Sequence, residues 1–335
     1  MKFTSIVVCI ALIVSALIFA PNDRRDVKLG EGKGKSVELT EVNEFIDFLM
    51  FVTGEDNHMY LRSVPDVSEG FSNMSVKLLD SQDTDSRTQR VITKFISGTV
   101  HEETVVSQRL YQSKKSYDSG INAGREERQY EMSLTRSLSI YISDTAVYYH
   151  SSGNMYTNDN GSAIQFIFDM ELYNDADRTY IKFNRFDFTG DYREIGGKLL
   201  DSGIGIWFDV TFEDDLSMNE LLARTYIGEI ASELIGADES DFERTGDVYF
   251  AELSDESSID GEYEYLEIDI SNGKNPSAEY GMKLDEESDG YSNYASQLVR
   301  FSFENIDNTV VEFDEDIKVE KNIDKYFKVY EEDNK

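Results

Sequence analysis

The chain has 335 residues, enough for one large domain or two, and a folded body of this size buries roughly 75% of its unfolded-chain surface. Acidic residues number 66 against 32 basic ones, which gives a formal net charge of −34 at pH 7. This charge repels nucleic acid and anionic membranes, so it argues against DNA or RNA as a partner. The single cysteine, Cys9, lies in an apolar N-terminal run, so the body after it forms no internal disulfide.

The first twenty residues have the pattern of a signal peptide or an N-terminal membrane anchor. Met1 and Lys2 form a short positive start, Ile6 to Ala20 is uncharged and strongly apolar, and Val14-Ser15-Ala16 offers small residues for cleavage. The apolar run just reaches the lower length limit for crossing a bilayer, so cleavage and anchoring both stay open. The basic residues that follow argue the other way under the positive-inside rule, but long domains translocate regardless of charge. We therefore expect segment 1–20 to interact with the membrane, and the body to be secreted or anchored outside the cytoplasmic membrane.

Residues 21–38 are expected to form a flexible basic linker. Within them, the stretch GEGKGKS from Gly30 to Ser36 looks like a phosphate-binding loop. That motif needs a glycine where this chain has Leu29, and it joins a buried strand to a helix. A single domain is expected over 39–335, and a division into two halves near residue 213 stays open.

Spacing of apolar residues after the linker predicts a helix followed by a meander of strands. Thr40 precedes a helical pattern over Val42 to Val52, and strict two-residue alternation follows it. The expected strands are 130–143, 164–172 and 204–212, with turns at 158–161 and 174–177 and a bulge near Asn184 and Arg185.

A second helix and a second meander follow. Ser217 and Glu220 form a capping box, an apolar stripe continues to Ile235, and Gly236 ends the helix. Further strands are expected at 247–253, 264–270, 280–284 and 298–303, before a short polar helix over 321–330. The fold class is therefore α+β: a long, curved, half-barrel-like antiparallel sheet with a few amphipathic helices packed on one face.

Catalytic motifs are missing from the sequence. His101-Glu102-Glu103-Thr104 begins the H-E-x-x-H motif of zinc proteases, but Val105 takes the place of the second histidine. No Gly-x-Ser-x-Gly elbow marks a serine nucleophile, and no carboxylate pair stands out among 66 acidic residues. We expect no enzymatic activity and no cofactor, with an exported hydrolase kept as a third alternative.

One segment has the oxygen spacing of a calcium loop. Its candidate ligands are Glu256, Ser258, Asp260, Glu264 and Glu267, with Gly261 at the sixth position. The flanking segments VYFAEL and YLEIDI alternate like strands, whereas a calcium loop of this type lies between two helices. A solvated hairpin around Asp260-Gly261 is therefore favoured over a metal site.

Arg136 interrupts the apolar face of the strand expected over 130–143. A cation that faces an apolar cavity could hold the carboxylate or phosphate of a ligand, with Leu134, Leu138, Phe166 and Phe168 around its apolar tail. The alternatives are a local bulge at Arg136 or an arginine that extends to water at the rim of the sheet.

The whole pattern resembles the periplasmic lipoprotein-carrier fold and its lipid-binding half-barrel relatives over about Leu39 to Tyr330. The closing run VRFSFENIDNTVVEFDEDIK is similar to the last strand and tail of those proteins, except at Phe313-Asp314. The resemblance implies a non-enzymatic protein that holds a lipid or another amphiphile between sheet and helices. The alternative is a cell-surface interaction or adhesion protein with a solid core, whose acidic, tyrosine-rich exterior binds a protein or glycan.

Overall fold

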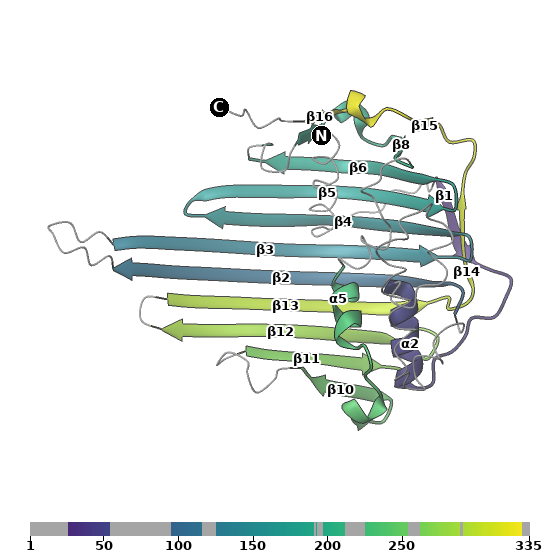
Figure 1. Cartoon of the computed structure of the whole chain (residues 1–335), viewed down its shortest axis with the longest axis horizontal. Helices are drawn as coiled ribbons and strands as arrows, with labels where there is room; N and C mark the ends of the chain where they lie inside the picture. The colour runs from purple at the N-terminus through teal and green to yellow at the C-terminus, as the bar shows by residue number, and fades with distance from the viewer. Residues whose placement is uncertain are drawn as a thin grey trace, which may run out of the picture.

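A computed structural model describes residues 26–53, 95–115, 125–190, 192, 197–211, 225–253, 262–288 and 291–329. They form a large twelve-stranded sheet, two α-helices, two small strand pairs and short 3-10 turns (Figure 1). The predicted signal or anchor at Ile6 to Ala20 lies outside this part of the chain. Neither described α-helix has the length and apolar character needed to span a bilayer.

The large sheet is open and curved, and it confirms the predicted fold class. Its strand order is β15-β8-β6-β5-β4-β3-β2-β13-β12-β11-β10-β9, with all neighbours antiparallel except β15 and β8. Pairing of β13 with β2 joins the two predicted meanders in one sheet. The strands are β2 (Gly98–Lys115), β3 (Arg125–Ile142), β4 (Ala146–Asp159), β5 (Ser162–Asp175), β6 (Thr179–Thr189), β8 (Trp207–Asp209), β9 (Glu243–Thr245), β10 (Val248–Glu252), β11 (Glu262–Asp269), β12 (Ser277–Ser288), β13 (Tyr291–Glu304) and β15 (Val319–Glu320).

Turns and a bulge fall where the sequence predicts them. The β4–β5 turn consists of Asn160 and Gly161, whose φ angles of 53° and 90° suit the left-handed turn that such hairpins prefer. Across β5 and β6, Asp169 pairs with Arg185 and Met170 pairs with Phe183. Asn184 is therefore the extra residue of a β-bulge, which keeps the phenylalanines on both sides of it facing the core.

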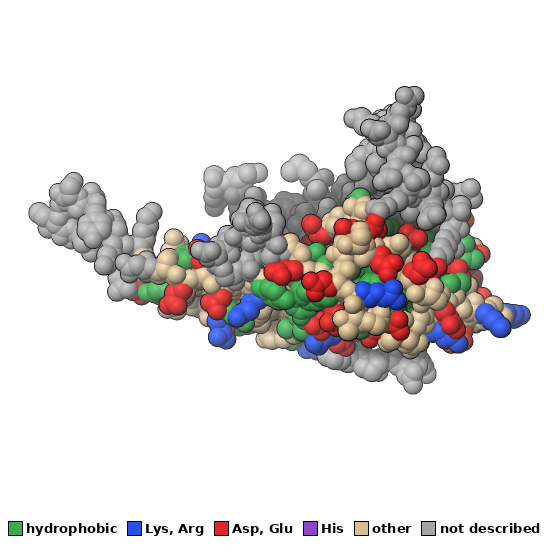
Figure 2. All heavy atoms as spheres, turned by 90° about the horizontal axis from the view of Figure 1, so that it is seen from below, with side chains coloured by type: hydrophobic (Ala, Val, Ile, Leu, Met, Phe, Trp, Pro, Cys, Tyr) green, Lys and Arg blue, Asp and Glu red, His purple; other side chains and the backbone are tan. Residues whose placement is uncertain are grey.

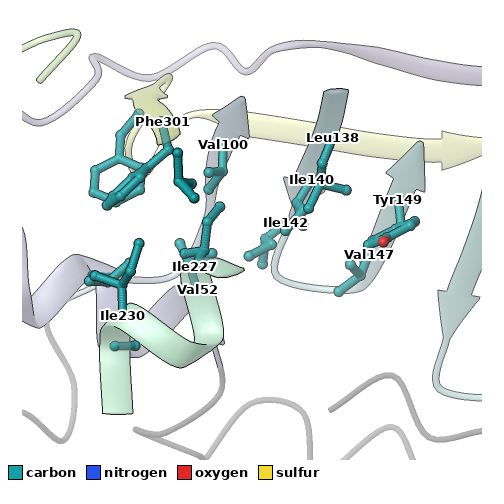
Figure 3. Packing of buried hydrophobic residues seen from close by; sticks show 14 of the residues in the cluster. Val52, Val100, Leu138, Ile140, Ile142, Val147, Tyr149, Ile227, Ile230 and Phe301 are labelled. Carbon is teal, nitrogen blue, oxygen red and sulfur yellow. The ribbon is translucent and has the colours of Figure 1, made fainter. Parts of the chain in front are cut away.

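Both α-helices pack on one face of the sheet, here called the helix face (Figures 1 and 3). In α2 (Val42–Thr53), Phe48 lies edge-on to Phe303 at 4.8 Å between ring centroids, and against Gly98, where a Cβ would come within 2.2 Å of its ring. In α5 (Tyr226–Glu233), Ile227 and Ile230 are buried. Apolar residues of the helix face continue this core from β2 across to β6.

The ends of the two helices differ in detail from the expected caps. Thr40 donates to the Glu44 carboxylate from its backbone N, at 2.8 Å, and from its hydroxyl, at 3.1 Å. The α5 helix begins after Thr225, whose hydroxyl accepts from the backbone N of Gly228 at 3.1 Å, and the expected capping box lies outside the described residues. Gly236 follows α5 with a φ of 85°, as a terminating glycine does.

Two segments form other elements than the sequence predicts. Among the described residues of the expected strand 204–212, which end at 211, only Trp207–Asp209 is a strand, because a 3-10 turn over Asp201–Gly203 (η2) and the left-handed Gly205 precede it. The C-terminal helix expected over 321–330 is wrong. Instead, a 3-10 turn at Ile323–Lys325 (η4) leads into β16 (Phe327–Val329), which pairs with β7 (Gly197–Leu199). Burial of Phe327 against Gly197 outweighs the local helical pattern.

The face of the sheet opposite the helices is partly covered at one end by a small strand pair. There β1 (Val27–Glu31) pairs with β14 (Thr309–Phe313), so part of the expected flexible linker is ordered. Val27 and Phe313 pack with Trp207, and Asp26 accepts hydrogen bonds from Trp207 Nε1 at 2.9 Å and Lys182 Nζ at 2.6 Å. The first described residue is therefore hydrogen-bonded to the sheet. A further short 3-10 turn, η3, lies at Glu239–Asp241.

Candidate binding face

The five residues predicted to bind a ligand are all buried on the helix face. Leu134, Leu138, Phe166 and Phe168 are at most 4% exposed, and they belong to one core cluster. The Phe166 and Phe168 rings stack at 5.2 Å between centroids. These side chains already contact one another, and their role in holding an apolar ligand tail stays a prediction.

Arg136 lies in the middle of β3 and is completely buried. It forms an ion pair with the equally buried Glu102 of β2, and its guanidinium carbon lies 5.0 Å from the centre of the Tyr226 ring in α5. Gly153, its register partner on β4, leaves room for the long side chain. Strand pairing is regular on both sides of Arg136, so neither the bulge nor the rim position applies.

Charges around Arg136 balance one another in a dry environment. Burial, the largest single effect, lowers the pKa of Arg136, but the Glu102 carboxylate together with Tyr149 and Tyr226 outweighs it, so the pKa is raised above its usual value. Glu229 of α5 has a raised pKa, first because of partial desolvation, although Arg136 acts to lower it. A ligand's acidic head would therefore have to displace Glu102 or join it, and both changes carry a large desolvation cost.

The opposite face carries the alternate residues of each strand, among them Ser107, Ser133, Ser137 and Ser139, and is here called the serine face. Two open hollows lie on it. The first, the tyrosine hollow, has a volume of about 870 Å³ and includes Ser107, Arg109, Tyr111, Glu131, Tyr294 and Ser296 in its lining. The second, the histidine hollow, has about 400 Å³ and includes His101, Glu103, Glu279 and Arg300.

A row of side chains crosses the tyrosine hollow from strand to strand. Tyr294, Arg109, Glu131 and Asn158 are register partners on β13, β2, β3 and β4, so the row spans ~14 Å at the usual strand spacing. Arg109 Nε donates to Glu131 Oε1 at 3.3 Å, and these side chains are 73% and 46% exposed. Tyr294 is 38% exposed. Aromatic, cationic and carboxylate groups thus lie side by side and accessible.

Glu279 is the centre of hydrogen bonding beside the histidine hollow. It accepts from Tyr265 OH and from Arg300 Nε, both at 2.7 Å. The Tyr265 hydrogen bond, with help from Arg300, holds the pKa of Glu279 below its usual value, while burial first and Glu279 second raise the pKa of Tyr265 to about 12. The Tyr265 ring lies over Gly281, where a Cβ would come within 2.3 Å of it. Figure 2 views the β10–β11 edge of the sheet, where acidic side chains surround a hydrophobic area.

Two histidines on the serine face each contact a carboxylate. His101 Nε2 lies 3.1 Å from Glu304 Oε1, and His101 Nδ1 lies 2.9 Å from Ser139 Oγ. His150 Nε2 lies 3.1 Å from Asp169 Oδ1. No sequence motif reveals these histidine–carboxylate contacts, because the residues that form them are on separate strands.

The candidate calcium loop, for which the sequence favours a solvated hairpin, is only partly within the described residues. Glu256, Ser258 and Asp260 lie outside them, whereas Glu264 and Glu267 are in β11. Glu264 accepts from Tyr280 OH on the helix face, and Glu267 is on the other face, so the two carboxylates point apart. Across the described part of the chain, no group of three or more His, Cys, Asp or Glu residues is arranged to hold a metal ion.

Comparisons with known proteins give no family for this chain. No protein-family model matches it, and no curated protein matches it either. Among solved structures, the translocator domain of autotransporter NalP from Neisseria meningitidis has 9% sequence identity and a TM-score of 0.12, covering 69% of this chain and 95% of that one. A likeness of this size carries no argument about fold or function.

Proposed function

We propose that the protein is an extracytoplasmic binding protein whose serine face holds a neutral glycan in the tyrosine hollow. The observation that carries the proposal is the exposed row of Tyr294, Arg109, Glu131 and Asn158. The apolar side of a sugar ring packs on an aromatic ring, and its hydroxyls both donate and accept hydrogen bonds. Tyrosine, guanidinium, carboxylate and amide groups supply that combination of contacts.

Charge and composition favour a glycan over other ligands of this face. The net charge of −34 disfavours an anionic ligand. The centre of a protein–protein interface is depleted of glutamate, whereas Glu131 is in the middle of this row. The hollow of about 870 Å³ is within the usual range of ligand sites.

Binding of the full chain to an array of neutral oligosaccharides tests the proposal. We expect saturable binding to a subset of the glycans, and at least a tenfold loss of affinity for Tyr294→Ala and for Arg109→Ala, which corresponds to ~1.4 kcal/mol. Tyr263→Ala is the matched control, since Tyr263 is an exposed tyrosine of the same face that is 42% exposed and outside the hollow. An absence of binding, or an equal loss in the control, would contradict the proposal.

A further inference from the structure

Ser139 lies between two histidines on the serine face. In the register of the sheet, His101 of β2 and His150 of β4 are its direct neighbours on either side. Its hydroxyl oxygen is 2.9 Å from His101 Nδ1, and Glu304 of β13 is 3.1 Å from the other nitrogen of that ring. A serine, a histidine and a carboxylate therefore form one hydrogen-bonded chain across three strands.

The carboxylate determines which ring nitrogen of His101 carries the proton. Glu304 accepts hydrogen bonds only, so the proton of neutral His101 lies on Nε2. Nδ1 is then an acceptor and takes the hydroxyl hydrogen of Ser139. This order is that of a nucleophile, a base and a group that orients the base.

The group is accessible from solvent. The side chains of His101 and Glu304 are 39% and 36% exposed, and Ser139 is partly exposed. His101 also lines the histidine hollow of about 400 Å³, so a small molecule could reach the ring.

We propose that Ser139, His101 and Glu304 form an acyl-transfer site for small esters, an activity that goes beyond the proposed glycan binding. Ser139 Oγ attacks the ester carbonyl carbon, its proton passes to His101 Nδ1, and the carbonyl electron pair moves to oxygen. When the intermediate collapses, the C–O bond to the alcohol breaks and His101 protonates the leaving alcohol. Water repeats these steps on the acyl-serine, which releases the acid and restores Ser139.

His150 and Glu304 border the Ser139–His101 pair. His150 flanks Ser139 on the side away from His101, at the ~5 Å spacing of laterally paired side chains. Its Nε2 lies 3.1 Å from Asp169 Oδ1, so the proton of the neutral ring points at that carboxylate and not at the developing oxyanion. Glu304 is a positioning residue, because it acts only through His101, whose Nε2 proton it holds.

A fluorophosphonate probe tests the proposal on the full chain. Its fluoride leaves when a nucleophilic serine attacks phosphorus, and peptide mass spectrometry identifies the labelled residue. We expect one equivalent of label at Ser139, none in Ser139→Ala, and a labelling rate at least 100-fold lower in His101→Ala. Ser137→Ala is the matched control, since Ser137 is the adjacent serine on the same face of β3 and should label like the wild type.

Glu304→Gln separates a catalytic arrangement from a structural one. Loss of the carboxylate should slow labelling, because the His101 ring loses the group that holds its Nε2 proton, and Glu304→Asp, which keeps the carboxylate, should restore part of the rate. Circular dichroism of each variant shows that it is folded. No labelling of the wild-type chain, labelling that survives in Ser139→Ala, or an equal labelling rate in Glu304→Gln and the wild type would overturn the proposal.

Discussion

Replacing Glu102 with glutamine should strongly destabilise the protein. Glu102→Gln preserves the shape of the side chain but removes the carboxylate charge that pairs with the completely buried Arg136 guanidinium. Breaking a buried ion pair in this way costs about 3–5 kcal/mol. The Tyr226 ring offsets only part of that cost, since a desolvated cation–π contact contributes about 2 kcal/mol.

Removing both charges should have a much smaller effect. In the double variant Glu102→Met/Arg136→Met, apolar side chains of similar length replace the pair, and such replacements are often neutral or stabilising by about 1–4 kcal/mol. Together with the single variants Glu102→Met and Arg136→Met, the double variant then gives a coupling energy of several kcal/mol. Arg109→Met and Glu131→Met form the control cycle, because that exposed pair should contribute at most about 1 kcal/mol.

Urea unfolding followed by tryptophan fluorescence measures these free energies. Trp207 is the single tryptophan and is 1% exposed, so its emission reports on unfolding of the sheet. Unchanged slopes of the free energy against urea would show that the variants differ in stability alone. A cost below about 1 kcal/mol for Glu102→Gln would refute the reasoning, because it would mean that Arg136 is hydrated or has another counter-charge.

Three further predictions concern pH, packing and ligand content. Burial first raises the pKa of Tyr149 to about 12, so the folded state favours the neutral phenol. The stability this gives is present below pH 10 and is lost as pH rises towards 12. Between pH 9 and pH 12, the free energy of unfolding of the wild type should therefore fall by about 2 kcal/mol more than that of Tyr149→Phe, as measured by urea unfolding at each pH. Gly281→Ala should cost about 1–3 kcal/mol in urea unfolding, because the new methyl group meets the Tyr265 ring, whereas Gly30→Ala, with open space around its Cα, should change stability little. Native mass spectrometry of protein purified without detergent should find no acyl ligand if the apolar residues between sheet and helices are a solid core, and co-purified lipid would favour the carrier prediction instead.

Most strands of the sheet can be predicted from the sequence, because the residue patterns that mark a strand are local. Alternation over 130–143 predicts β3, and Asn160-Gly161 predicts the type of the β4–β5 turn. The change of parity between Phe183 and Phe186 predicts the bulge at Asn184. The same local signals fail over 321–330, where a polar helical pattern competes with burial of Phe327 against a distant glycine.

Side-chain partners across strands are not predictable in this way. Glu102 and Arg136 meet because of the β2–β3 register, and nothing in either segment alone shows that they pair. Arg136 is therefore identifiable as unusual from the sequence, but not as the partner of Glu102. His101, Ser139 and Glu304 likewise come together only when β13 pairs with β2 and β2 with β3.

Pairing of β13 with β2 also has a consequence for synthesis on the ribosome. His101 and Glu304 are separated by 203 residues in the chain, so the outer edge of β2 has no β13 partner until nearly the whole protein has been made. At elongation rates of about 5–20 residues per second, this interval lasts roughly 10–40 s. During it, the nascent chain presents an 18-residue strand with one edge not yet paired to β13. Unpaired edges of this kind recruit other strands, so aggregation during expression should depend on how quickly the C-terminal half arrives.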